Sequence, residues 1–484
     1  MKLINKVIFS LLFLLFYSVS FAQDYAVVAN KNLKDDAEWN QVISFLQNKY
    51  DAPVFYYKDA PAELLDSLKK YTPRFVAFVD KANFINASYI MELRRLSRQV
   101  DDDVYADYLW GVVTGYDAQA AMQLIQNAEK PLVVKSALST IAELRSAKWF
   151  DRYAWLDDHE EGLCGIKNSK NDSVSVSRFN PTESLQKFYD FYKTYDPDLM
   201  VTSGHATERN LEMPFSHGNI KSKNGKLYAA FPEGKEYLVE SGKRRVFLGA
   251  GNCLMGNVRN NPNSMAIAYI TSGNATAMAG YVVTSWYGRA GWGTLKYWLY
   301  SKDLTLAEAI FLNEQDMLHQ MNAWHDKFNL VNFPYAKSEA HLAGEMKKAK
   351  AVIQGGLGIE SPTKDHLGFL YDRDVFAYYG DPKAEILLNN QNKDYSVSYK
   401  THGKNCVITI KTSKDFSMNR LKGEGFKQEH VKDLPFSFFF PKRLKKPVLK
   451  TEVKGDVLLD EDFILIYNPE FKAGEKYKIT LEVE

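Results

Sequence analysis

Two uninterrupted apolar runs, each ending on a reactive side chain, constrain the fold of this chain more than any other feature. The runs cover residues 199–205, which end on His205, and residues 245–253, which end on Cys253. Their apolar residues lack helical spacing, so both runs are typical of central strands in a parallel sheet. In open α/β sheets, ligands bind where several such strands end. We therefore expect an α/β fold with His205 and Cys253 at one sheet edge.

A thiol and an imidazole at one sheet edge make a nucleophile and its base. The thiolate is the attacking species, and the imidazole helps to form it and later returns a proton to the leaving group. Gly249, Gly251 and Gly256 surround the cysteine, and glycines favour a sharp turn with close substrate approach over an ordinary core position. We expect Cys253 to be the nucleophile of a cysteine peptidase and His205 its general acid/base.

The order and spacing of these two residues are similar to those of caspases. His205 precedes Cys253 by 48 residues, near the roughly 50 that separate the two in caspases. Three further segments carry an acidic and aromatic approach to a glycine turn, a strand with a Trp, and a Gly-Asp-Pro, namely residues 101–117, 279–286 and 378–382. In this order, the motifs resemble those of the gingipain-like cysteine peptidases, which have a caspase-like fold.

This resemblance covers residues 25–385 and implies further roles. Backbone N–H groups at Cys253 and Ala206 would bind the oxyanion, with Ala206 standing where the family has Gly. Asn252 stands where a small apolar residue is usual. Trp286 would form a wall of the pocket for the substrate side chain before the scissile bond. The reaction requires no metal or other cofactor, and a structural calcium ion remains open.

Several alternatives remain open beside this interpretation. His217 is followed directly by Gly218, as in the family motif, but its approach is loop-like, whereas a strand holds an imidazole in place. His402 and Cys406 lie in the β-rich tail, where we expect a turn. Another enzyme reading is a sortase-like transpeptidase of type IX secretion. The non-enzymatic reading is a degenerate module kept for binding or assembly.

An acidic run at residues 157–161 follows a strand predicted near Trp155. If that strand is parallel to the other two, Asp157 and Asp158 lie on the catalytic side and could pair with Arg or Lys of a substrate. A solvated loop remote from the pocket is the alternative. The run lacks the helical His-Glu-x-x-His spacing, so we expect no catalytic metal there.

The first 22 residues have the pattern of a secretory signal peptide. Lys2 and Lys6 precede an apolar run, and small residues end it before Gln23. No later run is long and apolar enough to span a bilayer, so we expect an exported protein, periplasmic or extracellular. Removal of Lys2 and Lys6 with the signal peptide lowers the number of basic residues from 61 to that of the acidic residues, 59. A neutral chain argues against nucleic acid or anionic membrane as the main partner and leaves protein or peptide substrates.

The cysteine count excludes a disulfide scaffold. The chain has three cysteines, Cys164, Cys253 and Cys406, so at least one thiol is unpaired within the chain. Cys164 and Cys406 could pair if Cys253 is free, because sequence alone does not set connectivity.

The pattern along the chain predicts three structural domains after the signal peptide at 1–22. We expect an N-terminal α/β subdomain at 23–130, a caspase-like catalytic subdomain at 131–389 with parallel sheets and flanking helices, and a small immunoglobulin-like β-sandwich at 390–484. The expected strands include 25–29, 54–57 and 75–80, and the expected helices include 38–50, 62–71, 118–128, 184–195, 264–272, 304–322 and 340–353.

Overall fold

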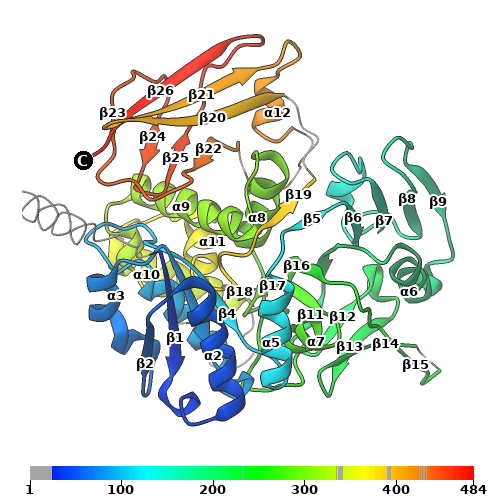
Figure 1. The fold of residues 1–484 in the computed structure, drawn as a ribbon. Coiled ribbons are helices and arrows are strands. Elements are labelled where there is room, and N and C mark those ends of the chain that lie inside the picture. Colours follow the sequence, from blue (N-terminus) through cyan, green and yellow to red (C-terminus); the bar gives the residue numbers. More distant parts are fainter. Residues whose placement is uncertain are drawn as a thin grey trace, which may run out of the picture.

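The computed structural model describes residues 24–231, 233–333, 335, 342–389, 394–424, 426, 428, 431 and 433–484. The predicted signal peptide at 1–22 lies outside these residues. An α/β body forms most of the structure, and a β-rich C-terminal part packs on one side of it (Figure 1). Among the described residues, no helix combines the length and the apolar character needed to cross a bilayer.

One 12-stranded sheet runs through the whole α/β body, in the order β2-β1-β3-β4-β18-β17-β16-β10-β6-β7-β8-β9. Its strands are β1 (Tyr25–Asn30), β2 (Val54–Tyr57), β3 (Phe75–Val79), β4 (Leu109–Val113), β6 (Ser136–Ser139), β7 (Arg152–Leu156), β8 (Leu163–Lys167), β9 (Ser175–Arg178), β10 (Leu199–Gly204), β16 (Arg245–Asn252), β17 (Ala275–Tyr281) and β18 (Phe376–Gly380). The sheet therefore continues across the predicted boundary between the two α/β subdomains.

Ten strands of the sheet form two parallel halves that run in opposite directions, and β8 and β9 pair antiparallel beside β7. Strands β1, β2, β3, β4 and β18 pair in parallel in one half, and β17, β16, β10, β6 and β7 pair in parallel in the other. The halves meet where β17 pairs antiparallel with β18. As a result, the carboxyl ends of β7, β6, β10, β16 and β17 gather at one edge.

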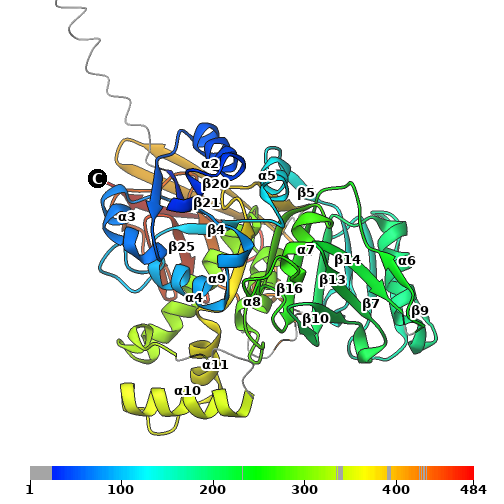
Figure 2. The same cartoon turned by 90° about the horizontal axis from the view of Figure 1, so that it is seen from below.

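The helices connect and cover these strands. They are α2 (Ala37–Tyr50), α3 (Leu65–Tyr71), α4 (Ala87–Leu96), α5 (Ala118–Asn127), α6 (Ser184–Tyr195), α7 (Met265–Thr271), α8 (Arg289–Tyr300), α9 (Leu306–Trp324), α10 (Leu342–Leu357) and α11 (Lys364–Asp372). Local chemistry sets their ends: in α2, Asp36 accepts hydrogen bonds from the backbone N–H of Glu38 and Trp39. Helices α10 and α11 share a separate apolar cluster and extend away from the sheet in Figure 2.

The C-terminal part is a sandwich of two small antiparallel sheets around one apolar core. One sheet contains β20 (Tyr395–His402), β21 (Asn405–Thr412), β26 (Lys476–Glu482) and β23 (Val448–Leu449); the other contains β22 (Phe436–Phe439), β25 (Phe463–Ile466) and β24 (Val457–Leu459). Phe311 of α9 makes edge contacts with Phe439 and Phe463. The predicted fold class, parallel sheets with helices followed by a β-sandwich, is confirmed.

Two features differ from the expectations. A five-stranded antiparallel sheet lies between β10 and β16 in the sequence, and no pattern predicted it; its strands are β11 (Ala206–Thr207), β12 (Asn210–Glu212), β13 (Asn219–Lys223), β14 (Lys226–Ala230) and β15 (Glu236–Leu238). The strand expected over 279–286 ends at Tyr281. Trp286 therefore lies in the connection to α8, because Gly288, at φ 83°, begins a new helix there.

Candidate active site

His205 and Cys253 leave the sheet from facing positions. Strands β10 and β16 pair in parallel up to their last residues, Gly204 opposite Asn252, and His205 and Cys253 follow directly. Neighbouring strands are about 4.8 Å apart. His205 is exposed and Cys253 is half-buried. The fold thus brings the predicted nucleophile and base to adjacent positions of one edge, while their catalytic roles stay predictions.

The thiol of Cys253 is held in a partly closed site. Its Sγ donates to the carbonyl oxygen of Ser285 at 3.7 Å. Burial raises the pKa of this thiol above its usual value, so the neutral form predominates here at pH 7. Leu254 follows with φ 59°, an uncommon angle for a residue with a side chain. Within the described part of the chain, no hydrogen bond joins Cys253 to His205.

The other strand offers a backbone donor beside the imidazole. The N–H of Glu212 donates to the carbonyl of His205 at 3.0 Å, which makes these two a hydrogen-bonded pair of the antiparallel ladder. The next pair is Ala206 opposite Leu211, and in such a pair the N–H groups point away from the partner strand. Because β11 is the edge strand of its sheet, the N–H of Ala206 points away from β12 and from the rest of that sheet.

Asn252 is a site residue to which the sequence assigned no role. It is fully buried. Its Oδ1 accepts from the hydroxyl of Thr202 at 2.6 Å, and its Nδ2 donates to the carbonyl of Gly204 at 3.1 Å. The only signal in the sequence was the departure from a small apolar residue at this position.

The segment after β17 lies against the cysteine. Leu254 donates its N–H to the carbonyl of Val283 at 3.0 Å, and Trp286 follows directly on Ser285, whose carbonyl accepts from Cys253. The half-buried Trp286 ring lies 5.8 Å from the Tyr287 ring, between centroids. This arrangement keeps Trp286 beside Cys253, although its role in the substrate pocket stays a prediction.

The acidic run lies at the same edge, because β7 is parallel to β6 and β6 is parallel to β10. Asp157 uses its carboxylate internally: one oxygen pairs with Arg145, and the other accepts from the N–H groups of His159 and Glu160 at 2.8 Å. Burial, with the charge of Glu143, raises the pKa of Asp158 to about 6. Substrate binding by Asp157 and Asp158 stays a prediction.

The histidines and cysteines that the sequence offered as alternatives lie elsewhere or have other partners. His217 Nε2 lies 2.7 Å from a carboxylate oxygen of Glu161. His402 ends β20 in the sandwich. The thiol of Cys406 accepts from the hydroxyl of Tyr399 at 3.1 Å, and Cys164 lies 3.3 Å from the hydroxyl of Ser177. All three cysteines are free, so Cys164 and Cys406 are not bridged.

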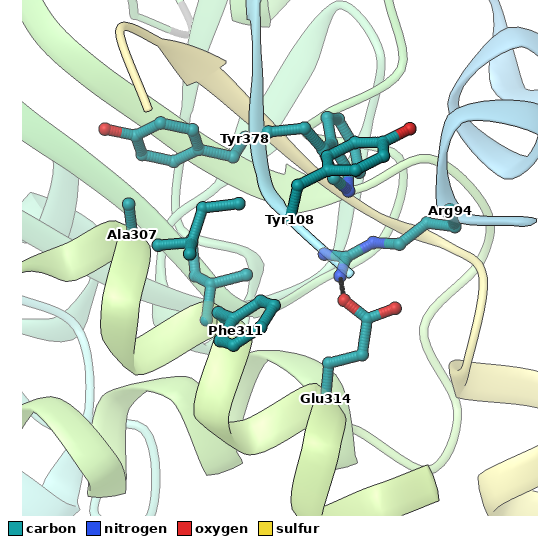
Figure 3. A pocket seen from close by; sticks show the side chains of 9 residues that line it. Arg94, Tyr108, Ala307, Phe311, Glu314 and Tyr378 are labelled. Carbon is teal, nitrogen blue, oxygen red and sulfur yellow. Dashed lines mark hydrogen bonds and ion pairs between the residues drawn. The ribbon is translucent and has the colours of Figure 1, made fainter. Parts of the chain in front are cut away.

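An interior cavity lies in the half of the sheet that contains β4 and β18. Figure 3 shows Arg94 and Glu314 pointing toward each other across it, with Phe311 and Tyr378 beside them. Its volume is about 10 Å³, which is about one water molecule. This cavity is too small for a peptide side chain.

Two groups of side chains lie close enough to share a cation. One consists of Asp101, Asp103 and Asp107, and the other of Glu143, Asp158 and His159. Burial, followed by the charge of Asp101, raises the pKa of Asp107 to about 8. The expectation of a structural calcium ion stays a prediction.

Comparisons with known proteins give similarities at the level of structure. No protein-family model and no curated protein matches the chain. The crystal structure of the Arg-specific cysteine proteinase gingipain R matches 96% of this chain and 92% of its own, at TM-score 0.41 and 10% identity. A complex of Porphyromonas gingivalis RgpB pro- and mature domains matches 95% of this chain and 93% of its own, at TM-score 0.39 and 10% identity. A structure described as a protease matches 81% and 85%, at TM-score 0.39 and 11% identity. With TM-scores below 0.5, these similarities do not decide what this site does.

Proposed function

We propose that this chain is an exported cysteine endopeptidase of gingipain-like type that hydrolyses peptide bonds through an acyl-enzyme. The observation that carries the proposal is the parallel register of β10 and β16 up to Gly204 and Asn252. His205 and Cys253 follow these two residues directly, which supports a thiol and imidazole pair at the edge where ligands of α/β sheets bind. Nothing else in the described residues delivers a half-buried thiol to such an edge.

The proposed reaction begins with proton transfer from Cys253 to His205. The sulfur attacks the substrate carbonyl, and the negative charge on the carbonyl oxygen is stabilised by the N–H groups of Cys253 and Ala206. His205 then protonates the leaving amine, and water releases the acyl group. Because burial raises the pKa of the free thiol, the thiolate needs a proton acceptor such as His205 to form.

The substrate is a protein or peptide, and Trp286 forms the wall for the side chain before the cut. A preference for Arg or Lys at that position remains part of the proposal, with Asp158 as the partner through the oxygen that does not accept from the N–H of Ala142. Asp157 contributes less, since Arg145 and two backbone N–H groups already occupy its carboxylate. The chemistry needs no cofactor, and a structural calcium ion is a separate question.

A peptide-based thiol probe tests the proposal. Cys164 and Cys406 are each 1% exposed, so labelling of the folded protein should stop at one thiol and disappear in Cys253→Ala. The same variant, and His205→Ala, should lose peptide-library cleavage with unchanged thermal unfolding. His217→Ala is the matched control and should retain cleavage.

The outcomes separate the readings. Cleavage by Cys253→Ala at the wild-type rate would refute the proposal. A dead His217→Ala with an active His205→Ala would mean that the other imidazole is the base. Labelling with acyl transfer to an added amine, and no hydrolysis, would indicate the transpeptidase, and an unreactive Cys253 would indicate the degenerate module.

A further inference from the structure

We infer that Asn252 is a positioning residue that holds the peptide bond carrying His205 in register with Cys253. This inference rests on the proposed function, because it assigns Asn252 a task in the same site. The juxtaposition behind it is a buried side-chain amide of the cysteine strand bonded to the last carbonyl of the histidine strand.

The pairing of the two strands is interrupted just before the site. Thr202 pairs with Gly249, but Ser203 pairs with Gly251, so β16 has one extra residue at this point. Such a bulge locally disrupts the ladder of backbone hydrogen bonds. The strand ends that deliver the two reactive residues therefore need another connection.

Asn252 provides that connection across the bulge. Its Oδ1 accepts from the Thr202 hydroxyl before the bulge, and its Nδ2 donates to the Gly204 carbonyl after it. The side chains of Asn252 and Thr202 are buried, at 0% and 4% exposed, whereas Gly204 at the end of β10 is exposed. The Gly204 carbonyl fixes which end of the amide faces it, since a carbonyl oxygen only accepts and therefore selects the Nδ2 donor.

The bond to Gly204 controls the orientation of His205. Gly204 has φ 120°, a conformation that favours glycine, and an added Cβ would meet nothing within 4 Å. This residue is therefore a flexible joint in open space. Its carbonyl belongs to the same planar peptide as the N–H of His205, so Asn252 sets the plane from which the imidazole departs.

The opposite side of His205 is held independently. The N–H of Glu212 donates to the carbonyl of His205 at 3.0 Å, which fixes the peptide that includes the N–H of Ala206. His205 thus lies between two held peptide planes. Loss of Asn252 frees the first and leaves the second, so the imidazole shifts while the proposed oxyanion donor stays.

The test uses the full chain and a set of paired variants. Asn252→Ala removes both bonds, Asn252→Asp keeps the size and the acceptor but loses the donor, and Thr202→Val removes the hydroxyl within the same shape. Thr276→Val is the matched control, because the buried Thr276 hydroxyl on the neighbouring strand β17 has no hydrogen-bond partner among the residues that the structure describes.

We expect kcat to fall in Asn252→Ala by about 10- to 100-fold with little change in KM, since a 1 Å misplacement of a catalytic group has effects of that size. Asn252→Asp should fall similarly, and Thr202→Val should fall by less. Thr276→Val should stay at the wild-type rate. A wild-type kcat in Asn252→Asp would show that the Nδ2 donor to Gly204 is not needed, and would overturn the inference.

A double variant tells positioning from general weakening. The rate of Cys253 labelling by the peptide probe is measured for Asn252→Ala with and without His205→Ala. If Asn252 acts through His205, Asn252→Ala should slow labelling in the wild-type background and should have no further effect in the His205→Ala background. An equal additional loss in the His205→Ala background would overturn the inference.

The fold and the proposed function are checked separately. Thermal unfolding monitors each variant, and if Asn252→Ala does not fold, a wild-type kcat in Thr202→Val refutes the inference by itself. Persistent cleavage by Cys253→Ala would instead refute the proposed function.

Discussion

Asp316 of α9 joins two helices and the C-terminal sandwich through one buried carboxylate. One oxygen pairs with Arg289 of α8, and the other accepts from Tyr467 at 2.9 Å and from Gln320 at 2.7 Å. The side chains of Arg289 and Asp316 are each 3% exposed. Replacing Asp316 with Ala would leave a buried guanidinium without its anion.

This geometry sets the expected loss of stability. Removing one partner of a buried ion pair costs about 3–5 kcal/mol, because the other charge stays buried and uncompensated. Tyr467→Phe removes only one hydrogen bond to a charged acceptor and should cost about 1.5–3 kcal/mol. Asp316→Asn should resemble Asp316→Ala, since it keeps the shape but loses the charge that Arg289 requires.

The assay is urea unfolding followed by tryptophan fluorescence, with the free energy of unfolding obtained by linear extrapolation. The control is Glu470→Ala, because Glu470 and its partner Lys454 have side chains that are 65% and 73% exposed; this variant should unfold like the wild type. A loss below about 1 kcal/mol in Asp316→Ala, or full stability in Asp316→Asn, would contradict the expected role of the ion pair.

Two further predictions concern helix packing and pH. An added Cβ at Gly291 would lie 2.1 Å from the carbonyl oxygen of Ala250, so Gly291→Ala should push α8 off β16, destabilise the protein by about 1–3 kcal/mol and slow probe labelling. At Gly355 an added Cβ meets nothing within 4 Å, so the control Gly355→Ala should instead stabilise the protein by about 0.5–1 kcal/mol. Equal shifts of the two variants in urea unfolding would refute the packing argument. Burial and the charge of Asp101 raise the pKa of Asp107 to about 8, so the folded state holds a proton that the unfolded chain releases above about pH 4. Stability from this group therefore falls as the pH rises from about 4 to 8, and the gain in thermal midpoint of Asp107→Asn over the wild type should be larger at pH 8 than at pH 5; a gain independent of pH would be the contrary result.

Local patterns in the sequence predicted most of the elements that form the site. The apolar runs before His205 and Cys253 are β10 and β16, and their parallel pairing follows from the α/β class. The helix expected at 184–195 has those bounds, and the one expected at 118–128 ends one residue earlier. Side-chain periodicity and helix caps act over a few residues, so they can be recognised without knowledge of the rest of the chain.

The arrangement of these elements depended on contacts between distant residues. The antiparallel meeting of β17 and β18 joins residues about a hundred positions apart, and no local pattern specifies it. The sheet from β11 to β15 consists of strands of two to five residues, and β13 and β14 alternate in burial over only five residues each, so it escaped prediction. Trp286 was expected on a strand because residues 279–286 resemble a strand of the gingipain-like family, whereas the strand ends at Tyr281.

The sequence by itself therefore determined which residues follow the two central strands at this edge, His205 and Cys253, because consecutive apolar side chains identify a buried strand. Only the tertiary structure decided how they are held there. The register of β10 against β16 shifts between Thr202 and Ser203. The two hydrogen bonds of Asn252 join residues that are 50 and 48 positions apart in the sequence. A buried amide satisfies its donor and acceptor with whatever the folded neighbours present, and those neighbours are known only when the strands have paired.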